Sequence, residues 1–222
     1  MNQHQYQHQR VPDRPSTPQV FSGPLLLLLL LLLVLPATSQ AHALIPGTGE
    51  FSRGLLHPLV TPAHVLLLLA MGLWIGQHPP LRLRVPTLLF MAFSAAGLLV
   101  TTQVSFPASG YLLLIGIALL LALCVVALVR IPVWAGWLII AVAAFAVGLD
   151  SGVDRGPMLA AVVATYAGSW ITLTLCFLNS SFYTALCPKW KWVQIGIRVA
   201  ASWIAAICLL LLAFALQGQA FT

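Results

Sequence analysis

Long apolar segments alternate with short polar ones over most of the chain. Six of these segments are long enough to cross a bilayer as helices, since about 20 apolar residues span its hydrocarbon core. The expected spans cover residues 55–77, 85–102, 109–129, 132–149, 157–181 and 193–216. Because the connections between them are short, consecutive helices should run antiparallel within one bundle. The pattern therefore predicts an all-α integral membrane protein, a six-transmembrane-helix bundle with no soluble domain.

The beginning of the chain has the pattern of a signal peptide. A polar tail, residues 1–24, precedes an almost pure leucine run at 25–35, which is short for a span but suits a signal peptide. Small residues follow, and we expect cleavage after Ala41, with Ala43 as a second candidate and an uncleaved anchor as the alternative. The predicted organisation is a tail and signal peptide (1–41), a periplasmic amino-terminal segment (42–54), the transmembrane domain (55–216) and a short periplasmic tail (217–222).

Basic residues lie at the ends of the apolar segments and predict the orientation of the bundle. If the signal peptide is cleaved, the loops expected inside carry most of them: Arg82, Arg84, Arg130, Lys189 and Lys191. Tryptophans expected to form an aromatic belt fall near the same ends: Trp74, Trp134, Trp190 and Trp192. Lys and Arg are retained on the cytoplasmic side of membrane proteins. We therefore expect both mature termini on the outer, periplasmic side.

The composition narrows the class of protein further. With 60% hydrophobic and 6% charged residues, the chain is not an ordinary soluble domain. Its formal charge of +6 comes from scattered basic residues, which indicates a topology signal rather than a nucleic-acid-binding surface. The sequence contains no Ser–His–acid set, no P-loop and no dinucleotide-binding fingerprint. We therefore expect neither an enzyme nor a cofactor, and the lipid bilayer is the main partner.

Two histidines in the first expected span are the main candidates for chemistry. His57 and His64 are seven residues apart, close to two helical turns, so a continuous helix would place both on nearly the same face. An imidazole in hydrocarbon needs a partner or water, which makes intramembrane histidines candidate functional residues. Pro58 and Pro62 lack backbone donors and predict a kinked or re-entrant start to this span.

Acidic residues expected on the same side of the membrane complete a candidate metal site. Asp150 and Asp154 lie at the outer end of the fourth span, and His42 would be the mature amino terminus. Imidazole and carboxylate together suit Ni, Co, Zn, Fe or Mn, and ligand type alone does not choose among them. The predicted metal ligands are His57, His64, Asp150 and His42. The alternative is that both aspartates flank a Gly-rich turn, with Asp154 paired to Arg155.

Other polar and small residues in the spans are better explained by helix packing. The fifth span carries a polar stripe on one face: Thr165, Ser169, Thr172, Cys176 and Asn179. We expect this stripe, like Gly72 and Gly76 in the first span, to be a helix-packing surface, with a hydrophilic path as the alternative for the stripe. Arg198 in the last span is assigned to structure or lipid contact.

Several of these segments resemble one known family. The run HPLVTPAHVLLLLAMGLW (57–74), preceded by a signal peptide ending near Ala-His, is similar to the first motif of HupE/UreJ proteins. These are six-span bacterial inner-membrane proteins associated with hydrogenase and urease accessory genes, and they are regarded as nickel or cobalt permeases. The similarity continues through VPTLLFMAFSAAG (85–97) and YAGSWITLTL (166–175), so it covers essentially the whole mature chain.

The chain also departs from the family pattern. The family's first motif has an aspartate just before its second histidine, where this chain has Ala63. The histidine-rich motif of span four is replaced here by AFAVGLDSG (144–152), and the histidine usual late in span five is missing. Of the family's metal-binding pattern, His57 and His64 carry over, and Asp150 would be a substitute ligand.

The resemblance implies a divergent permease that moves a divalent transition metal, nickel or cobalt, from the periplasm to the cytoplasm across the bacterial inner membrane. His57 and His64 would be the first ligands the metal meets, assisted by Asp150 and His42. The metal would be the substrate and not a cofactor. A non-transporting membrane accessory or assembly subunit that has lost the transport ligands is the alternative. The sequence leaves open whether the chain forms a homo-oligomer or joins a membrane partner subunit.

Overall fold

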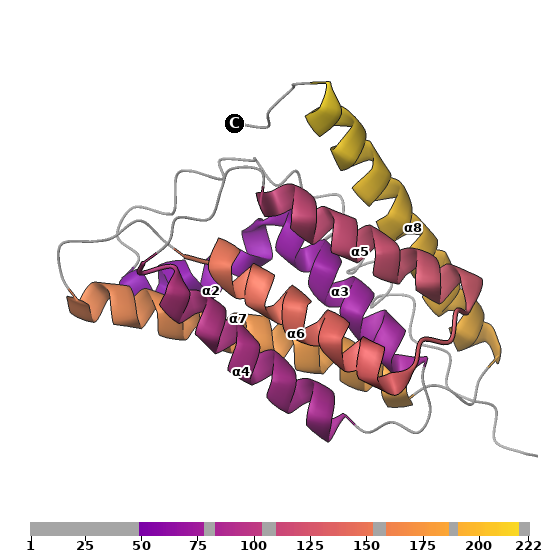
Figure 1. Cartoon of the computed structure of the whole chain (residues 1–222), viewed down its shortest axis with the longest axis horizontal. Helices are drawn as coiled ribbons and strands as arrows, with labels where there is room; N and C mark the ends of the chain where they lie inside the picture. The colour runs from indigo at the N-terminus through magenta and orange to yellow at the C-terminus, as the bar shows by residue number, and fades with distance from the viewer. Residues whose placement is uncertain (1–48, 78–82, 104–109, 153–158, 187–190, 218–222) are drawn as a thin grey trace, which may run out of the picture. The chain divides into compact units, whose positions relative to one another are not determined.

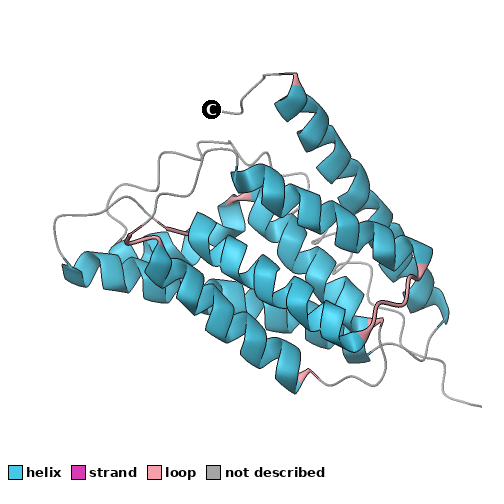
Figure 2. Ribbon diagram, viewed as in Figure 1, coloured by secondary structure: helices cyan, strands magenta, loops and turns pink. Residues whose placement is uncertain are grey.

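The computed structural model of the chain describes residues 49–77, 83–103, 110–152, 159–186 and 191–217, all within one compact unit, residues 41–222. Every regular element in these ranges is an α-helix (Figures 1 and 2), which confirms the predicted all-α class. The helices are α2 (Glu50–Val60), α3 (Pro62–Gly76), α4 (Arg84–Val100), α5 (Gly110–Ala127), α6 (Val133–Asp150), α7 (Leu159–Leu186) and α8 (Lys191–Leu216). The expected signal peptide, His42, His78 and Asp154 lie outside the described residues.

Helix length and composition indicate a multi-pass membrane protein. Four helices are long and apolar enough to cross a bilayer: α5, α6, α8 and the part of α7 from Leu159 to Phe182. Helices α2 and α3 qualify together as a fifth span that is bent by 67°, and α4 is a shorter apolar helix of 17 residues. Each of the six predicted apolar segments therefore contains helix, and the first of them is divided in two.

The first predicted span is broken where the sequence places its prolines. Thr61 leaves the helix with φ −91° and ψ 108°, and Pro62, which has no backbone donor, begins α3. Thr61 Oγ1 donates to the carbonyl oxygen of His57 over 2.8 Å and so satisfies one acceptor at the end of α2. The predicted kink is confirmed, since α2 and α3 point in directions 67° apart.

Helix α2 packs against α7 with backbone touching backbone. A Cβ at Gly54 would collide with the carbonyl oxygen of Thr165, and one at Gly168 would collide with that of Phe51. Small residues allow membrane helices to approach in this way, and van der Waals contact then holds them together. The two glycines therefore seat α2 along the first half of α7.

A hydroxyl group on α7 replaces a donor that proline removes from α2. In an ideal helix the N–H of residue 58 would bond the carbonyl of Gly54, but Pro58 has no N–H. Ser169 Oγ donates to that carbonyl over 3.2 Å. Backbone acceptors freed by proline in an apolar environment need such a partner, so Ser169 makes Pro58 tolerable inside α2.

Ser169→Ala is expected to lower the free energy of unfolding by about 1 kcal/mol, because the carbonyl of Gly54 would lack this donor in an apolar environment. Unfolding of the purified protein by SDS in mixed micelles measures the change. Ser202→Ala is the matched control, since Ser202 is exposed on α8 and its Oγ bonds the Val199 carbonyl of its own helix. Equal losses in the two variants would contradict the role given to Ser169.

The polar stripe on α7 is mainly a helix-packing surface. Two further hydroxyl groups bond the backbone of α2: Thr165 Oγ1 donates to Glu50 O over 3.1 Å, and Thr172 Oγ1 donates to Leu55 O over 2.9 Å. This confirms the packing prediction for the first three members of the stripe. The other two, Cys176 and Asn179, line a mainly apolar groove of about 250 Å³ beside the bend.

Gly72 and Gly76 also lie at a helix contact, as predicted. A Cβ at Gly72 would collide with Ser180, and one at Gly76 would collide with Thr184, both of which belong to α7. Ser180 Oγ donates to the carbonyl of Leu68 over 3.1 Å. Helix α7 therefore holds both halves of the bent span and keeps the angle between them.

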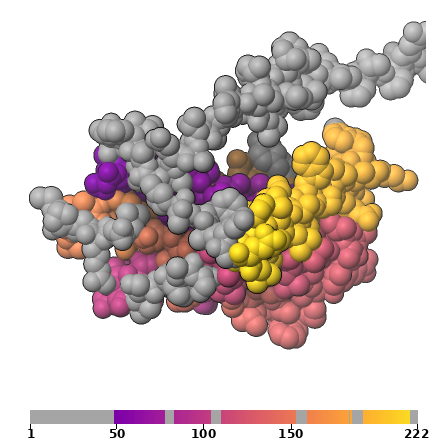
Figure 3. Space-filling model, turned by 90° about the horizontal axis from the view of Figure 1, so that it is seen from above, coloured from indigo at the N-terminus to yellow at the C-terminus, as the bar shows by residue number. Residues whose placement is uncertain are grey.

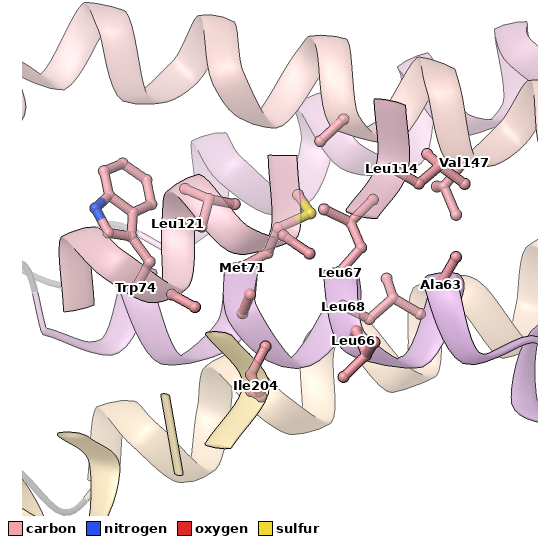
Figure 4. Packing of buried hydrophobic residues seen from close by; sticks show 14 of the residues in the cluster. Ala63, Leu66, Leu67, Leu68, Met71, Trp74, Leu114, Leu121, Val147 and Ile204 are labelled. Carbon is pink, nitrogen blue, oxygen red and sulfur yellow. The ribbon is translucent and has the colours of Figure 1, made fainter. Parts of the chain in front are cut away.

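The apolar core is centred on α3, with side chains of α5, α6, α7 and α8 packed around it. Leu67, Met71 and Leu114 have no exposed surface, and they follow α3 and α5 through the middle of the bundle (Figure 4). Trp74 was expected at a membrane interface, but it is only 6% exposed. Its indole fills the space where Gly136 of α6 has no Cβ, so Trp74 is a core residue.

Helix α8 lies on the surface of the described part of the chain (Figure 3). Its buried residues, Ala201, Ile204, Ala205 and Cys208, lie on one face, and the helix packs mainly on α5. Arg198 Nε donates to the carbonyl of Val126 in the last turn of α5 over 3.1 Å. That contact supports the structural role expected of Arg198, because terminal helix carbonyls need external donors.

Candidate metal-binding site

Two of the predicted site residues meet although they are far apart in the sequence. His64 Nε2 lies 2.9 Å from Oδ2 of Asp150, 86 residues further along the chain. The side chain of His64 has no exposed surface, and that of Asp150 is 22% exposed. Hydrogen bonds to a charged acceptor are short and strong, and this one is largely shielded from solvent. Asp150 therefore has a specific partner in addition to its place at the end of α6.

His57 joins this pair from the other side of the bend. It lies in the last turn of α2, whereas His64 lies in the first turn of α3. Their ring centroids are 5.5 Å apart, and the rings meet edge to face at 78°. The two rings are not aligned along one continuous helix, because the helix breaks at Thr61, within the segment where the prolines predicted a kink. The bend, and not the seven-residue spacing, brings them into contact.

Asp150 is positioned by the close packing of α6 on α4. A Cβ at Gly148 would collide with the carbonyl oxygen of Ser94, and one at Gly97 would collide with that of Phe145. These backbone contacts fix how α6 lies along α4 up to its last turn, which ends at Asp150. The packing of α6 on α4 therefore positions the carboxylate. The packing of α2 and α3 on α7 positions both histidines.

Two ring nitrogens at this meeting point have no hydrogen-bond partner among the described residues. They are His57 Nε2 and His64 Nδ1, and both are buried atoms. A buried polar group without a partner is costly, and in native proteins it commonly marks an ion, a water molecule or a functional role. A neutral imidazole nitrogen with a free lone pair is also the commonest protein ligand of transition metals.

The three residues do not form a complete metal-binding group in this conformation. Among the residues that the structure describes, no set of three or more His, Cys, Asp and Glu side chains is arranged to hold a metal ion. His57, His64 and Asp150 are neighbours, but an oxygen of Asp150 is already engaged by His64. His42, the fourth predicted ligand, lies outside the described residues.

Three residues that shape the site were not singled out in the sequence. Thr61 forms the break between α2 and α3, and the prolines on either side of it were an available signal. Gly97 and Gly148 set the packing that positions Asp150. Each of these glycines meets a helix that is distant in the sequence, so no local pattern identifies them.

Comparison with known proteins assigns the chain to a family. The family model described as HupE / UreJ protein matches residues 29–211, which is most of the chain. No curated protein and no solved structure matches the chain. The matched region includes both histidines, Asp150 and every helix from α2 to α7. The chain therefore belongs to the HupE/UreJ family.

Proposed function

We propose that this protein is a permease that moves a divalent transition metal, nickel or cobalt, from the periplasm to the cytoplasm across the bacterial inner membrane. Family membership supports a membrane accessory or metal-transport-related role. The observation that carries the proposal is the meeting of His57, His64 and Asp150, where two buried ring nitrogens have no hydrogen-bond partner among the described residues.

The chemistry of this site suits a passing metal ion. Imidazole binds first-row transition metals from iron to zinc, whereas magnesium and calcium prefer oxygen ligands. Two imidazoles and a neighbouring carboxylate offer enough attraction to draw such an ion out of water. A site with few protein ligands also releases its ion readily, and conduction requires release as much as binding.

The proposed arrangement in the membrane follows the distribution of charge in the sequence. The bent pair α2–α3 and the shorter helix α4 would complete six spans together with α5, α6, α7 and α8. The amino-terminal leucine run would be a signal peptide, and the basic loops would face the cytoplasm. His57, His64 and Asp150 would then lie on the periplasmic side, where the ion enters.

A non-transporting accessory subunit is the competing function. It is favoured by the absence of a three-ligand group from the described part of the chain. In that case the His64–Asp150 contact would only hold the helices together. Replacing His64 would then change assembly with a partner or the stability of the protein, and not the metal content of cells.

Uptake of individual metals by whole cells tests the proposed function. Cells that express the wild-type chain, His64→Ala, or His57→Ala with His64→Ala are supplied with Ni, Co, Zn, Fe or Mn at matched membrane-protein levels. We expect the wild type to accumulate one or two of these metals, and both histidine variants to fall to the level of empty cells. His78→Ala, which removes an imidazole outside the candidate site, is the matched control and should behave as the wild type.

One outcome would contradict the permease, and another would contradict its candidate site. Equal accumulation in wild-type and empty cells for all five metals would exclude transport of these ions. Undiminished uptake by the double histidine variant would show that the ion does not pass the candidate site. The first result would leave the accessory function as the better account of the family relationship, whereas the second would retain a permease whose path does not include His57 and His64.

A further inference from the structure

We propose that Asp150 is a positioning residue rather than a metal ligand, and that the atoms facing the metal are His64 Nδ1 and His57 Nε2. This inference rests on the proposed function, because it assigns roles within the same site. It also replaces the expectation that Asp150 would be a substitute ligand. The evidence is that His64 Nε2 contacts Asp150, whereas His64 Nδ1 and His57 Nε2 are buried without a hydrogen-bond partner among the described residues.

The contact with Asp150 determines which nitrogen of His64 carries the proton. An ionised carboxylate only accepts hydrogen bonds, so the nitrogen 2.9 Å from Oδ2 must be the donor. That nitrogen is Nε2. In the neutral ring the lone pair then lies on Nδ1, the atom that is buried without a hydrogen-bond partner. Asp150 thus leaves His64 with its free lone pair on the side away from the carboxylate.

His57 offers the second nitrogen. Its Nε2 is buried and has no hydrogen-bond partner in the described part of the chain. In the tautomer that carries its proton on Nδ1, this nitrogen holds the free lone pair of the ring. Each of the two rings therefore has one buried nitrogen that no described residue engages.

The two free nitrogens belong to rings that touch. The centroids are 5.5 Å apart and the planes stand at 78°, so the edge of one ring meets the face of the other. One ring comes from α2 and the other from α3, on either side of the break at Thr61. The bend therefore brings together two rings that each have one buried nitrogen without a hydrogen-bond partner among the described residues, and Asp150 engages the other nitrogen of His64.

The position of Asp150 favours this indirect role. Asp150 is the last residue of α6, and the carboxyl end of a helix carries partial negative charge. A carboxylate there is unfavourable unless it is paired, and His64 supplies the pairing. A metal-bound histidine whose other nitrogen donates to a carboxylate is a general feature of metal sites, where the carboxylate orients the ring and raises its basicity.

This pair of nitrogen ligands narrows the class of metal ion that the site would bind. Two neutral nitrogen ligands, with the remaining positions filled by water, favour late divalent metals such as cobalt, nickel, copper and zinc over manganese, magnesium and calcium. No carboxylate oxygen would bind the ion directly. The same ligand set is weak enough for the ion to leave, which a permeation site requires.

Thiolate substitution distinguishes a ligand from a positioning residue. A thiolate bound to Co²⁺ gives an intense charge-transfer absorption in the near ultraviolet, which a distant thiolate does not give. The full chain, with its four native cysteines replaced by alanine, is purified in detergent and titrated with Co²⁺. We expect this absorption from His64→Cys and from His57→Cys, and none from Asp150→Cys.

Affinity measurements on two further variants complete the test. Asp150→Leu should weaken Co²⁺ and Ni²⁺ binding about 10–100-fold, the usual effect of losing the partner of a metal-bound histidine. Asp150→Asn should lose less metal affinity than Asp150→Leu, because its amide oxygen still accepts a hydrogen bond from His64 Nε2. Glu50→Gln, which neutralises a half-buried acid paired with Arg53, is the matched control and should bind as the wild type.

The outcomes separate this inference from the proposed function. A charge-transfer band from Asp150→Cys, or an unchanged affinity in a folded Asp150→Leu variant, would overturn the positioning role while leaving a metal site in place. A wild-type protein that binds neither Co²⁺ nor Ni²⁺ would overturn both the inference and the permease. Circular dichroism of each variant confirms that the helices are retained, and Asp150→Asn provides the comparison if Asp150→Leu does not fold.

Discussion

Gly168→Ala is expected to lower the free energy of unfolding by about 3 kcal/mol, although it adds a single methyl group. The new Cβ would collide with the carbonyl oxygen of Phe51, and it would lie 2.8 Å from the backbone nitrogen of Leu55. Backbone atoms cannot rotate away as the end of a side chain can, so α2 would have to move off α7. That movement would also lengthen the bond from Ser169 to Gly54, which is 3.2 Å long.

Unfolding by SDS in mixed micelles, monitored by circular dichroism, measures the effect of Gly168→Ala. Gly196→Ala is the matched control, because a Cβ at that position in α8 meets nothing within 4 Å. There the substitution should be neutral, or stabilising by up to about 1 kcal/mol through better helix propensity. If both variants were as stable as the wild type, α2 would not pack closely on α7 as described. The position given to His57 would then be wrong as well.

Gly148→Ala is expected to weaken metal binding about 10–100-fold, the same range as Asp150→Leu. Its Cβ would collide with the carbonyl oxygen of Ser94 and would push α6 away from α4, two residues before Asp150. The carboxylate would then leave the position in which it holds His64. The alanine side chain at position 148 does not reach the site. Any loss of metal affinity must therefore result from displacement of the α6 backbone.

Co²⁺ titration of single and double variants tests this route. If Gly148→Ala acts by displacing Asp150, the double variant with Asp150→Leu should bind no more weakly than Asp150→Leu alone. If the losses of Co²⁺ affinity in the two single variants were additive in the double variant, Gly148 would affect binding in some other way. Gly116→Ala, on α5 with no atom near its Cβ, is the matched control and should bind as the wild type.

The carboxylate at this site comes from the end of α6, as the predicted ligand set anticipated. HupE/UreJ proteins ordinarily have an aspartate just before the second histidine of their first motif, and here that position is Ala63, which is 5% exposed. In this chain Asp150 brings a carboxylate to the same histidine from α6. The residue before His64 therefore carries no acid in this chain, and the carboxylate beside the ring is that of Asp150.

The local features of the chain could be predicted because they depend on residues close together in sequence. Runs of apolar residues predict helices in a membrane, since a helix satisfies its backbone hydrogen bonds within one segment. Pro58 and Pro62 predict the break in the first span, since each removes a donor at a known position. The hydroxyl stripe beginning at Thr165 predicts a packing surface by its helical spacing alone. His57 and His64 stand out because imidazole is costly in lipid.

Contacts between distant segments had to come from the tertiary structure. No periodicity links His64 with a carboxylate 86 residues away, or Gly97 with Gly148 on another helix. The placement of Trp74 in an aromatic belt was wrong for the same reason, because its burial depends on Gly136 being opposite it. The sequence by itself determined the helices, the bend and the two histidines. Only the packing of α6 on α4, and of α2 and α3 on α7, decided that these histidines meet Asp150, because that packing depends on backbone contacts between segments far apart in the chain.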